Sequence, residues 1–131
     1  MNRTTMLLLG AAIIAGIVLT YFSRSGRDAS LSVKVPQLTA EAQAGRELFE
    51  GRCIACHGKN ATGTKNGPPL VHKIYEPNHH SDASFYRAVA QGTRAHHWPF
   101  GNMPPVTGVK KDEVAKIIGY VRELQRANGI K

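Results

Sequence analysis

Cysteine and histidine side chains meet at one point of the chain, in the stretch Cys53-Ile54-Ala55-Cys56-His57. On a helical turn, residues three apart lie on the same face, so the two thiols would point in one direction. Thiols at that spacing can form thioethers with the two vinyl groups on one edge of a porphyrin, and the adjacent imidazole can bind the iron. The spacing therefore predicts one covalently attached haem c, with Cys53 and Cys56 as its anchors and His57 as the proximal iron ligand.

Three other chemistries use two cysteines at this spacing. The pair could form a redox dithiol, half of a zinc site or a short disulfide. A thioredoxin-like dithiol needs a surrounding βαβ pattern, and the sequence has none. A zinc site needs two further ligands, but no other cysteine exists and the remaining histidines show no paired motif: His72, His79, His80, His96 and His97. We therefore favour haem attachment over these alternatives.

The chain is basic, with 17 lysines and arginines against 9 acidic residues and a net charge of +8 over 131 residues. A basic balance suits nucleic acid, anionic lipid or an acidic protein partner. The sequence contains no arginine-rich run and no basic recognition helix, so we expect no nucleic acid. A redox partner with an acidic docking face fits better, although solubility alone would account for the charge equally well.

An uncharged, apolar run occupies residues 6–22. Its 17 residues lie at the lower limit of a membrane-spanning helix, and a cleaved signal peptide is the alternative. The run ends without a small-residue cleavage pattern, whereas Tyr21 and Phe22 suit an anchor at the membrane interface. We predict an uncleaved, single-pass transmembrane anchor in residues 1–22, a flexible linker in residues 23–38 and a haem-binding domain in residues 39–131.

The orientation signals conflict. Arg3 precedes the apolar run, while Arg24, Arg27 and Lys34 follow it, so the positive-inside bias alone would place the domain in the cytoplasm. Covalent attachment of haem to a motif of this kind takes place outside the cytoplasm. We give the haem motif more weight than the charge bias and expect the domain on the periplasmic side of a bacterial inner membrane.

Three helices can be predicted around the haem motif. The first follows Thr39 as N-cap and presents Gly45 and Phe49 on one face before it ends near Cys53. The second opens at Ser81 and ends at Gly92. The third covers residues 111–127 and carries one apolar stripe, which we expect to pack on the face of Gly45 and Phe49: Val114, Ile117, Ile118, Val121 and Leu124.

Loop residues lie between the first two helices. Pro68 and Pro69 stiffen this loop, and a rigid carbonyl there could accept the Nδ1 proton of His57. Leu70 is expected to pack on the porphyrin. Beyond the second helix, Trp98 and Phe100 would provide apolar cover for the haem, or ordinary core.

Met103 is the only methionine of the predicted domain and lies in a loop stiffened by Pro104 and Pro105. Its thioether is our candidate for the second iron ligand, which would raise the reduction potential. As alternatives, Met103 fills a gap in the core, or His96 or His97 gives a bis-imidazole site.

Two histidine pairs flank the second helix: His79 with His80, and His96 with His97. Adjacent histidines suggest a metal site, but in loops they are more often solvated. The sequence therefore favours solvated side chains over a metal site for these four histidines.

The predicted domain resembles class I c-type cytochromes. The resemblance depends on the attachment motif, on residues 67–70 and 101–104, and on the helices around residues 45–49 and 117–120. It implies an all-α fold of three or more helices around one haem, with crossed first and last helices. It also implies His57 and Met103 as axial ligands and the Pro68 carbonyl as the acceptor for His57. Residues 76–80 and 95–100 depart from the family pattern.

The function implied is one-electron transfer, by a membrane-tethered carrier or by the haem subunit of a respiratory oxidoreductase. Such a protein is not itself an enzyme and needs no catalytic residue or small-molecule substrate. If Met103 does not bind the iron, a peroxidase-like haem enzyme or a ligand-binding haem sensor becomes the alternative.

Overall fold

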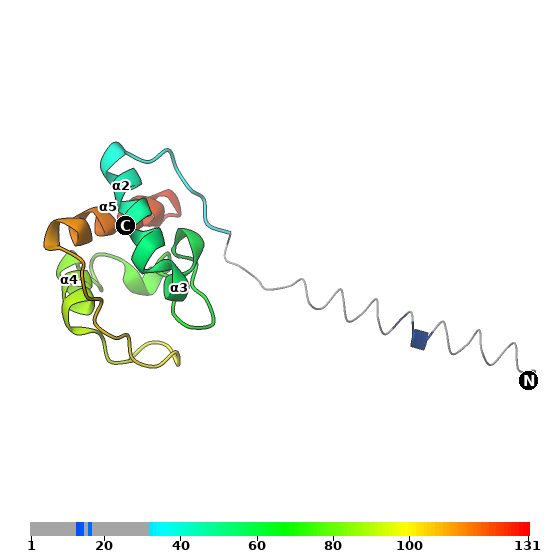
Figure 1. The fold of residues 1–131 in the computed structure, drawn as a ribbon. Helices are drawn as coiled ribbons and strands as arrows, with labels where there is room; N and C mark the ends of the chain where they lie inside the picture. Colours follow the sequence, from blue (N-terminus) through cyan, green and yellow to red (C-terminus); the bar gives the residue numbers. More distant parts are fainter. Residues whose placement is uncertain (1–12, 15, 17–31) are drawn as a thin grey trace, which may run out of the picture. The chain divides into compact units, whose positions relative to one another are not determined.

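The computed structural model describes residues 13, 14, 16 and 32–131 (Figure 1). The chain divides into two units, residues 1–30 and 31–131. Among the described residues, no helix combines the length and the apolar character needed to cross a bilayer. Most of the predicted anchor and the first part of the predicted linker lie outside the described residues, so both assignments stay predictions.

The second unit is built from helices. They are α2 (Ala40–Arg52), α3 (Ile54–His57), α4 (Asp82–Gln91) and α5 (Lys111–Ala127), with short 3₁₀ turns η1 (Lys59–Ala61) and η2 (Lys73–Tyr75). Within residues 32–131, β-type pairing is limited to isolated bridges between Thr64 and Gly67 and between Thr93 and Met103. The prediction of a helical domain is thus confirmed for the described part of the chain.

The helix ends lie where the sequence indicates them. The Thr39 hydroxyl accepts a hydrogen bond from the Ala42 amide (3.2 Å) and caps α2 as predicted. Helix α4 begins after Ser81 and ends at Gly92, although the Ser81 hydroxyl makes no capping bond. Helix α5 spans the predicted residues, and its Glu113 side chain accepts from the Lys110 amide at 2.7 Å.

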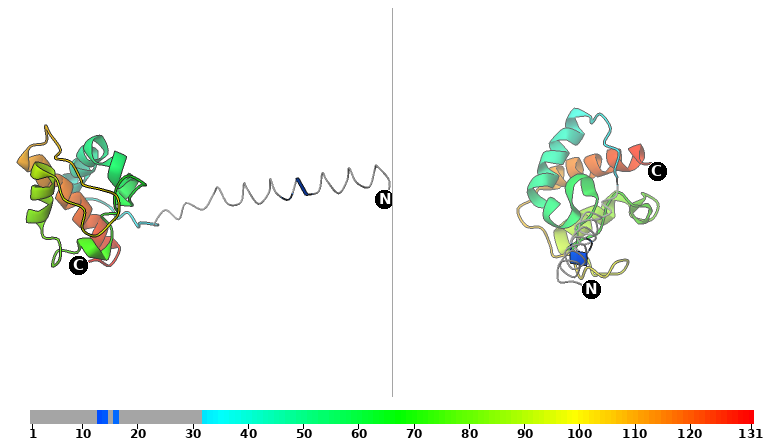
Figure 2. Two further views of the ribbon diagram at one scale, coloured as in Figure 1. Left: turned by 90° about the horizontal axis from the view of Figure 1, so that it is seen from below. Right: turned by 90° about the vertical axis from the view of Figure 1, so that its right-hand side faces the viewer.

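Helices α2 and α5 cross at the centre of the unit (Figure 2). A methyl group at Gly45 would overlap the carbonyl oxygen of Lys116, so only glycine permits this approach. Next to the crossing, the rings of Phe49 and Tyr120 meet edge to face with centroids 5.5 Å apart, and both side chains are fully buried. Such a pair adds about 0.5–1.5 kcal/mol beyond the area that it buries. The predicted packing of the first helix on the last is confirmed.

The apolar stripe of α5 is buried as expected, and two polar residues are buried beside it. Arg122 is 7% exposed and Gln125 is 1% exposed. The Arg122 side chain lies inside the domain and makes four hydrogen bonds there.

Residues 33–38, part of the predicted linker, lie against the helical unit. Val33 and Leu38 pack on the core. The Lys34 amide donates to Asn128 Oδ1 at 2.9 Å, and Asn128 Nδ2 donates back to the Lys34 carbonyl at 2.8 Å. The Thr39 hydroxyl donates to Glu123 at 2.7 Å. These contacts connect the chain before α2 to the end of α5.

Candidate haem site

Cys53 joins α2 to α3, and one helical turn carries the predicted attachment residues. The amides of Cys56 and His57 both donate to the Cys53 carbonyl, at 3.2 and 2.9 Å. Cys53 is half-buried, Cys56 is exposed, and both thiols are free. Cys53 and the short helix α3 therefore carry the two cysteines and the histidine on one helical turn.

The imidazole of His57 is fixed by a backbone carbonyl. Its Nδ1 lies 2.9 Å from the Pro68 oxygen, the contact that the resemblance implies. Because a carbonyl can only accept, Nδ1 carries the proton and Nε2 keeps a free lone pair. Burial lowers the pKa of His57, while the Pro68 hydrogen bond acts in the opposite direction. The ring is thus a neutral, oriented nitrogen donor, as a metal ligand must be.

Glycine allows the loop to reach the attachment turn. A side chain at Gly67 would press on the carbonyl oxygen and Cβ of Cys56. The Thr64 hydroxyl donates to that same carbonyl at 2.7 Å, and the Gly63 amide donates to the His57 carbonyl at 2.7 Å. The loop is therefore folded back on α3, which holds the Pro68 carbonyl beside His57.

Leu70 follows directly and is buried in the core. Its amide donates to the Ala61 carbonyl at 2.8 Å. The structure fixes this position, and the contact of Leu70 with haem stays a prediction.

Cys53 does not have the lowered thiol pKa of a redox dithiol. Burial, together with the neighbouring Cys56 and against the opposing effect of Arg52, raises the pKa of Cys53 to about 11. Reactive dithiols instead need a lowered thiol pKa. Within the described part of the chain, the cluster of side chains spaced to hold a metal ion contains neither cysteine. The geometry thus favours haem attachment over the redox and zinc alternatives.

Met103 is held by the end of α4. Its amide and carbonyl exchange hydrogen bonds with those of Thr93, both at 2.9 Å. A side chain at Gly92 would overlap the Met103 carbonyl oxygen, so this approach also requires glycine. The Met103 side chain is half-buried. Its backbone position is well defined, and its role as iron ligand stays a prediction.

Trp98 carries a buried hydrogen-bond donor without an acceptor. Among the described residues, nothing accepts a hydrogen bond from its Nε1. Burial raises the pKa of Tyr75, and the neighbouring Trp98 indole partly offsets that rise. The Trp98 N–H and the Tyr75 hydroxyl are nevertheless not placed to form a hydrogen bond with each other. Buried N–H groups are normally paired, so this position calls for an acceptor.

Sequence reasoning missed two groups of residues. His79, His80 and His97 come together in space although they belong to different loops. Arg122 and Gln125 fasten the loop before α4 to α5: Gln125 donates to the carbonyls of Leu70 (2.8 Å) and Tyr75 (3.0 Å). The adjacent histidines suggested a metal site but not which of them meet, whereas Arg122 and Gln125 continue the apolar periodicity of α5.

Comparison with protein families identifies the domain. The family model described as Cytochrome c matches residues 42–125, a span that contains the attachment turn, the Pro68 loop, Met103 and most of α5. Searches of curated proteins and of solved structures gave no match. On the family match, this chain belongs to the cytochrome c family, as a class I c-type cytochrome.

Proposed function

We propose that this protein transfers single electrons through one haem c, bound covalently by Cys53 and Cys56 and ligated by His57 and Met103. Membership of the cytochrome c family supports haem-based electron transfer in general. The observation that carries the proposal is the hydrogen bond from His57 to the Pro68 carbonyl on the attachment turn. It leaves the Nε2 atom of a neutral imidazole free on the same helical turn as the two cysteines, and these are the groups that haem c requires.

The residues of the domain fit this group. Two thiols supply the covalent attachment, an imidazole and a thioether supply the axial ligands, and the buried Trp98 Nε1 offers a hydrogen bond to an acceptor. Haem carries two carboxylates, and either could accept this hydrogen bond. Bound haem supplies an iron that alternates between the ferrous and ferric states, and Met/His ligation raises its potential.

Electron exchange needs an exposed path rather than a substrate pocket. Cys56 is exposed, so the haem edge attached there would lie near solvent. Exposed basic residues flank the attachment turn in sequence: Arg52, Lys59 and Lys65. The hydroxyl of Thr64 bonds to the Cys56 carbonyl, which brings Lys65 next to the turn. This charge supports an acidic docking face on the redox partner, whose approach it would accelerate at low salt.

We also propose that residues 1–22 anchor the protein in a bacterial inner membrane, with the domain on the periplasmic side. The uncharged run and the lack of a cleavage pattern support the anchor, and the haem-attachment motif supports the periplasmic side. Alkaline washing of isolated membranes should leave the full-length chain in the pellet. Release of a shortened chain would contradict the anchor. Proteins retained after gentle solubilisation would distinguish a free carrier from a subunit of an oxidoreductase.

Spectroscopy of the oxidised full-length protein tests the ligand assignment. We expect a sulfur-to-iron charge-transfer band that cyanide does not remove, and a reduced form that does not bind carbon monoxide. Met103→Leu should abolish the band while the haem stays covalently attached. Rapid binding of cyanide or carbon monoxide by the unchanged protein would instead indicate a haem enzyme or a ligand sensor.

A further inference from the structure

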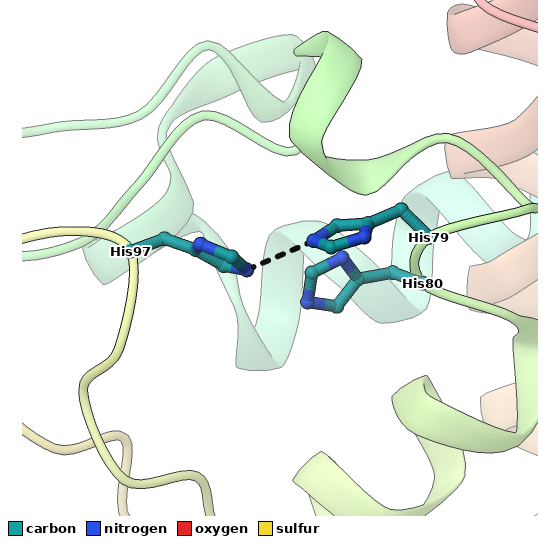
Figure 3. A group of neighbouring side chains, drawn as sticks. All are labelled: His79, His80 and His97. Atoms are coloured by element: carbon teal, nitrogen blue, oxygen red, sulfur yellow. Dashed lines mark hydrogen bonds between the residues drawn. The ribbon is translucent and has the colours of Figure 1, made fainter.

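Three imidazole rings converge at a place that electron transfer does not require. Figure 3 shows His97 approaching His79 and His80 from the opposite loop. One nitrogen from each ring lies within 4.8 Å of the others, and the Nε2 atoms of His79 and His97 are 3.3 Å apart. His79 and His80 precede α4, whereas His97 follows it. The cluster therefore joins two loops that are separate in sequence.

The hydrogen bonds of His80 leave a nitrogen available. Its Nδ1 donates to the Ile74 carbonyl at 2.6 Å, so its Nε2 carries a free lone pair. Metal-binding histidines are oriented in this way, with the other ring N–H donated to a carbonyl or carboxylate. His79 and His97 present their Nε2 atoms to each other at a distance that one shared proton or one metal ion can hold together.

The backbone that carries His79 and His80 is held in place by hydrogen bonds from the core. Arg122 donates to the carbonyls of His80 (2.6 Å) and Tyr75 (2.8 Å). The amides of His79 and His80 both donate to the Glu76 carbonyl, at 3.0 and 2.8 Å. The two rings thus stand on a backbone turn that is already ordered, which reduces the entropy lost when a ligand binds.

The surroundings favour neutral rings. Desolvation lowers the pKa of His80; the Ile74 hydrogen bond opposes this, and His79, His96 and Arg122 lower the pKa further. The pKa of His97 is also lowered, by desolvation and by the neighbouring imidazoles. Neutral imidazole is the form that binds metal.

We propose that His79, His80 and His97 bind a divalent transition-metal ion of the kind that prefers imidazole, with Zn²⁺ as the ion that fits best. Three imidazole nitrogens and one water would complete the tetrahedral set that zinc takes at open sites. Mg²⁺ and Ca²⁺ require oxygen ligands, and the cluster offers none. The ion would connect the loop before α4 to the loop that leads to Met103.

The test uses the untagged, haem-loaded full-length protein in detergent, freed of metal by a chelator. In this form both cysteines are thioethers and cannot compete for zinc. Isothermal titration should give one Zn²⁺ per chain and no heat with Mg²⁺. His79→Gln and His97→Gln should each weaken zinc binding by at least about tenfold, the lower end of what losing even an outer-shell partner costs. The haem spectrum should not change.

His96→Gln is the matched control. His96 is adjacent to His97, is exposed, and bonds through Nδ1 to its neighbouring Arg94 carbonyl at 2.7 Å. This variant should keep the zinc affinity, and circular dichroism should show that every variant is folded. Equal loss in all three variants, unchanged affinity in His79→Gln and His97→Gln, or no zinc binding by the parent protein would each overturn the proposal. None of these results depends on the ligands of the haem iron.

Discussion

Arg122 of α5 donates a hydrogen bond to the backbone carbonyl of His80 across 2.6 Å, which ties the last helix to the loop before α4. The same guanidinium bonds to the Tyr75 carbonyl and to Gln125 Oε1, and its Nε lies 2.9 Å from Asp82. A buried cation costs several kcal/mol to desolvate unless its hydrogen bonds are satisfied, as they are here. This arginine therefore fixes the loop that carries two of the clustered histidines.

Replacing Arg122 should release that loop. Arg122→Met keeps the length of the side chain but leaves carbonyl groups of the loop without their donor, so we expect a loss of about 2–4 kcal/mol in the free energy of unfolding. Urea unfolding followed by circular dichroism measures this loss. Asp82→Asn is the control, since the Asp82 side chain is 61% exposed and its ion pair should contribute about 1 kcal/mol or less. Equal losses in the two variants would contradict the role of the buried bonds.

Two glycines of α2 should respond in opposite directions to the same substitution. Gly45→Ala places a methyl group against the Lys116 carbonyl, so it should destabilise the domain by about 1–3 kcal/mol. Gly51 has open space around its Cα, and Gly51→Ala should stabilise by about 0.5–1 kcal/mol through helix propensity. Thermal unfolding of both variants measures the difference. A neutral Gly45→Ala variant would show that the helices cross less closely.

Met103→Leu should lower the reduction potential of the haem. Leucine fills a similar volume but offers no sulfur to the iron, so the Met/His ligation that raises the reduction potential is lost. Redox titration measures the potential, and the pyridine haemochrome assay shows whether the haem remains covalently bound. A potential equal to that of the parent protein would remove Met103 from the iron.

Tyr120 should make the domain sensitive to alkali. Burial raises the pKa of Tyr120 above its usual value near 10, so the unfolded chain releases the phenolic proton at a lower pH than the folded chain. The buried, protonated Tyr120 therefore contributes to the free energy of unfolding. This contribution is complete below about pH 10 and is lost as the pH rises through the folded-state pKa of Tyr120. Tyr120→Phe should therefore flatten the fall in unfolding free energy above about pH 10. Burial also raises the pKa of Tyr75, so part of the slope should remain. Identical slopes in both proteins would exclude Tyr120 as the cause.

Local patterns were sufficient to predict most of the fold. Thr39 as a cap, Gly92 as a helix end and the stripe of α5 each depend on a few neighbouring residues, and the structure confirms all of them. The crossing at Gly45 could be predicted because a glycine inside a helix face is costly unless another backbone comes close. The same stripe, continued from Val114 by eight and eleven positions, includes Arg122 and Gln125, so their burial could have been predicted too.

The histidine cluster could not be predicted in this way. His79 and His97 are in loops without periodicity, and their approach depends on how α4 turns the chain and on how Arg122 holds the first loop. The side-chain position of Met103 could likewise not be predicted from local sequence patterns. Such long-range contacts follow from the packed fold and leave no spacing signal in the sequence.

The pairing of Thr93 with Met103 closes the intervening segment at its base. The tip of this segment, which includes His96 and His97, projects from a base clamped by two backbone hydrogen bonds. Changes of residue type at the tip can therefore alter what the molecular surface recognises without displacing the methionine backbone. Under the proposed ligation, a substitution at His96 or His97 would leave the backbone that carries the iron ligand in place, because the Thr93–Met103 pairing holds it independently of the tip.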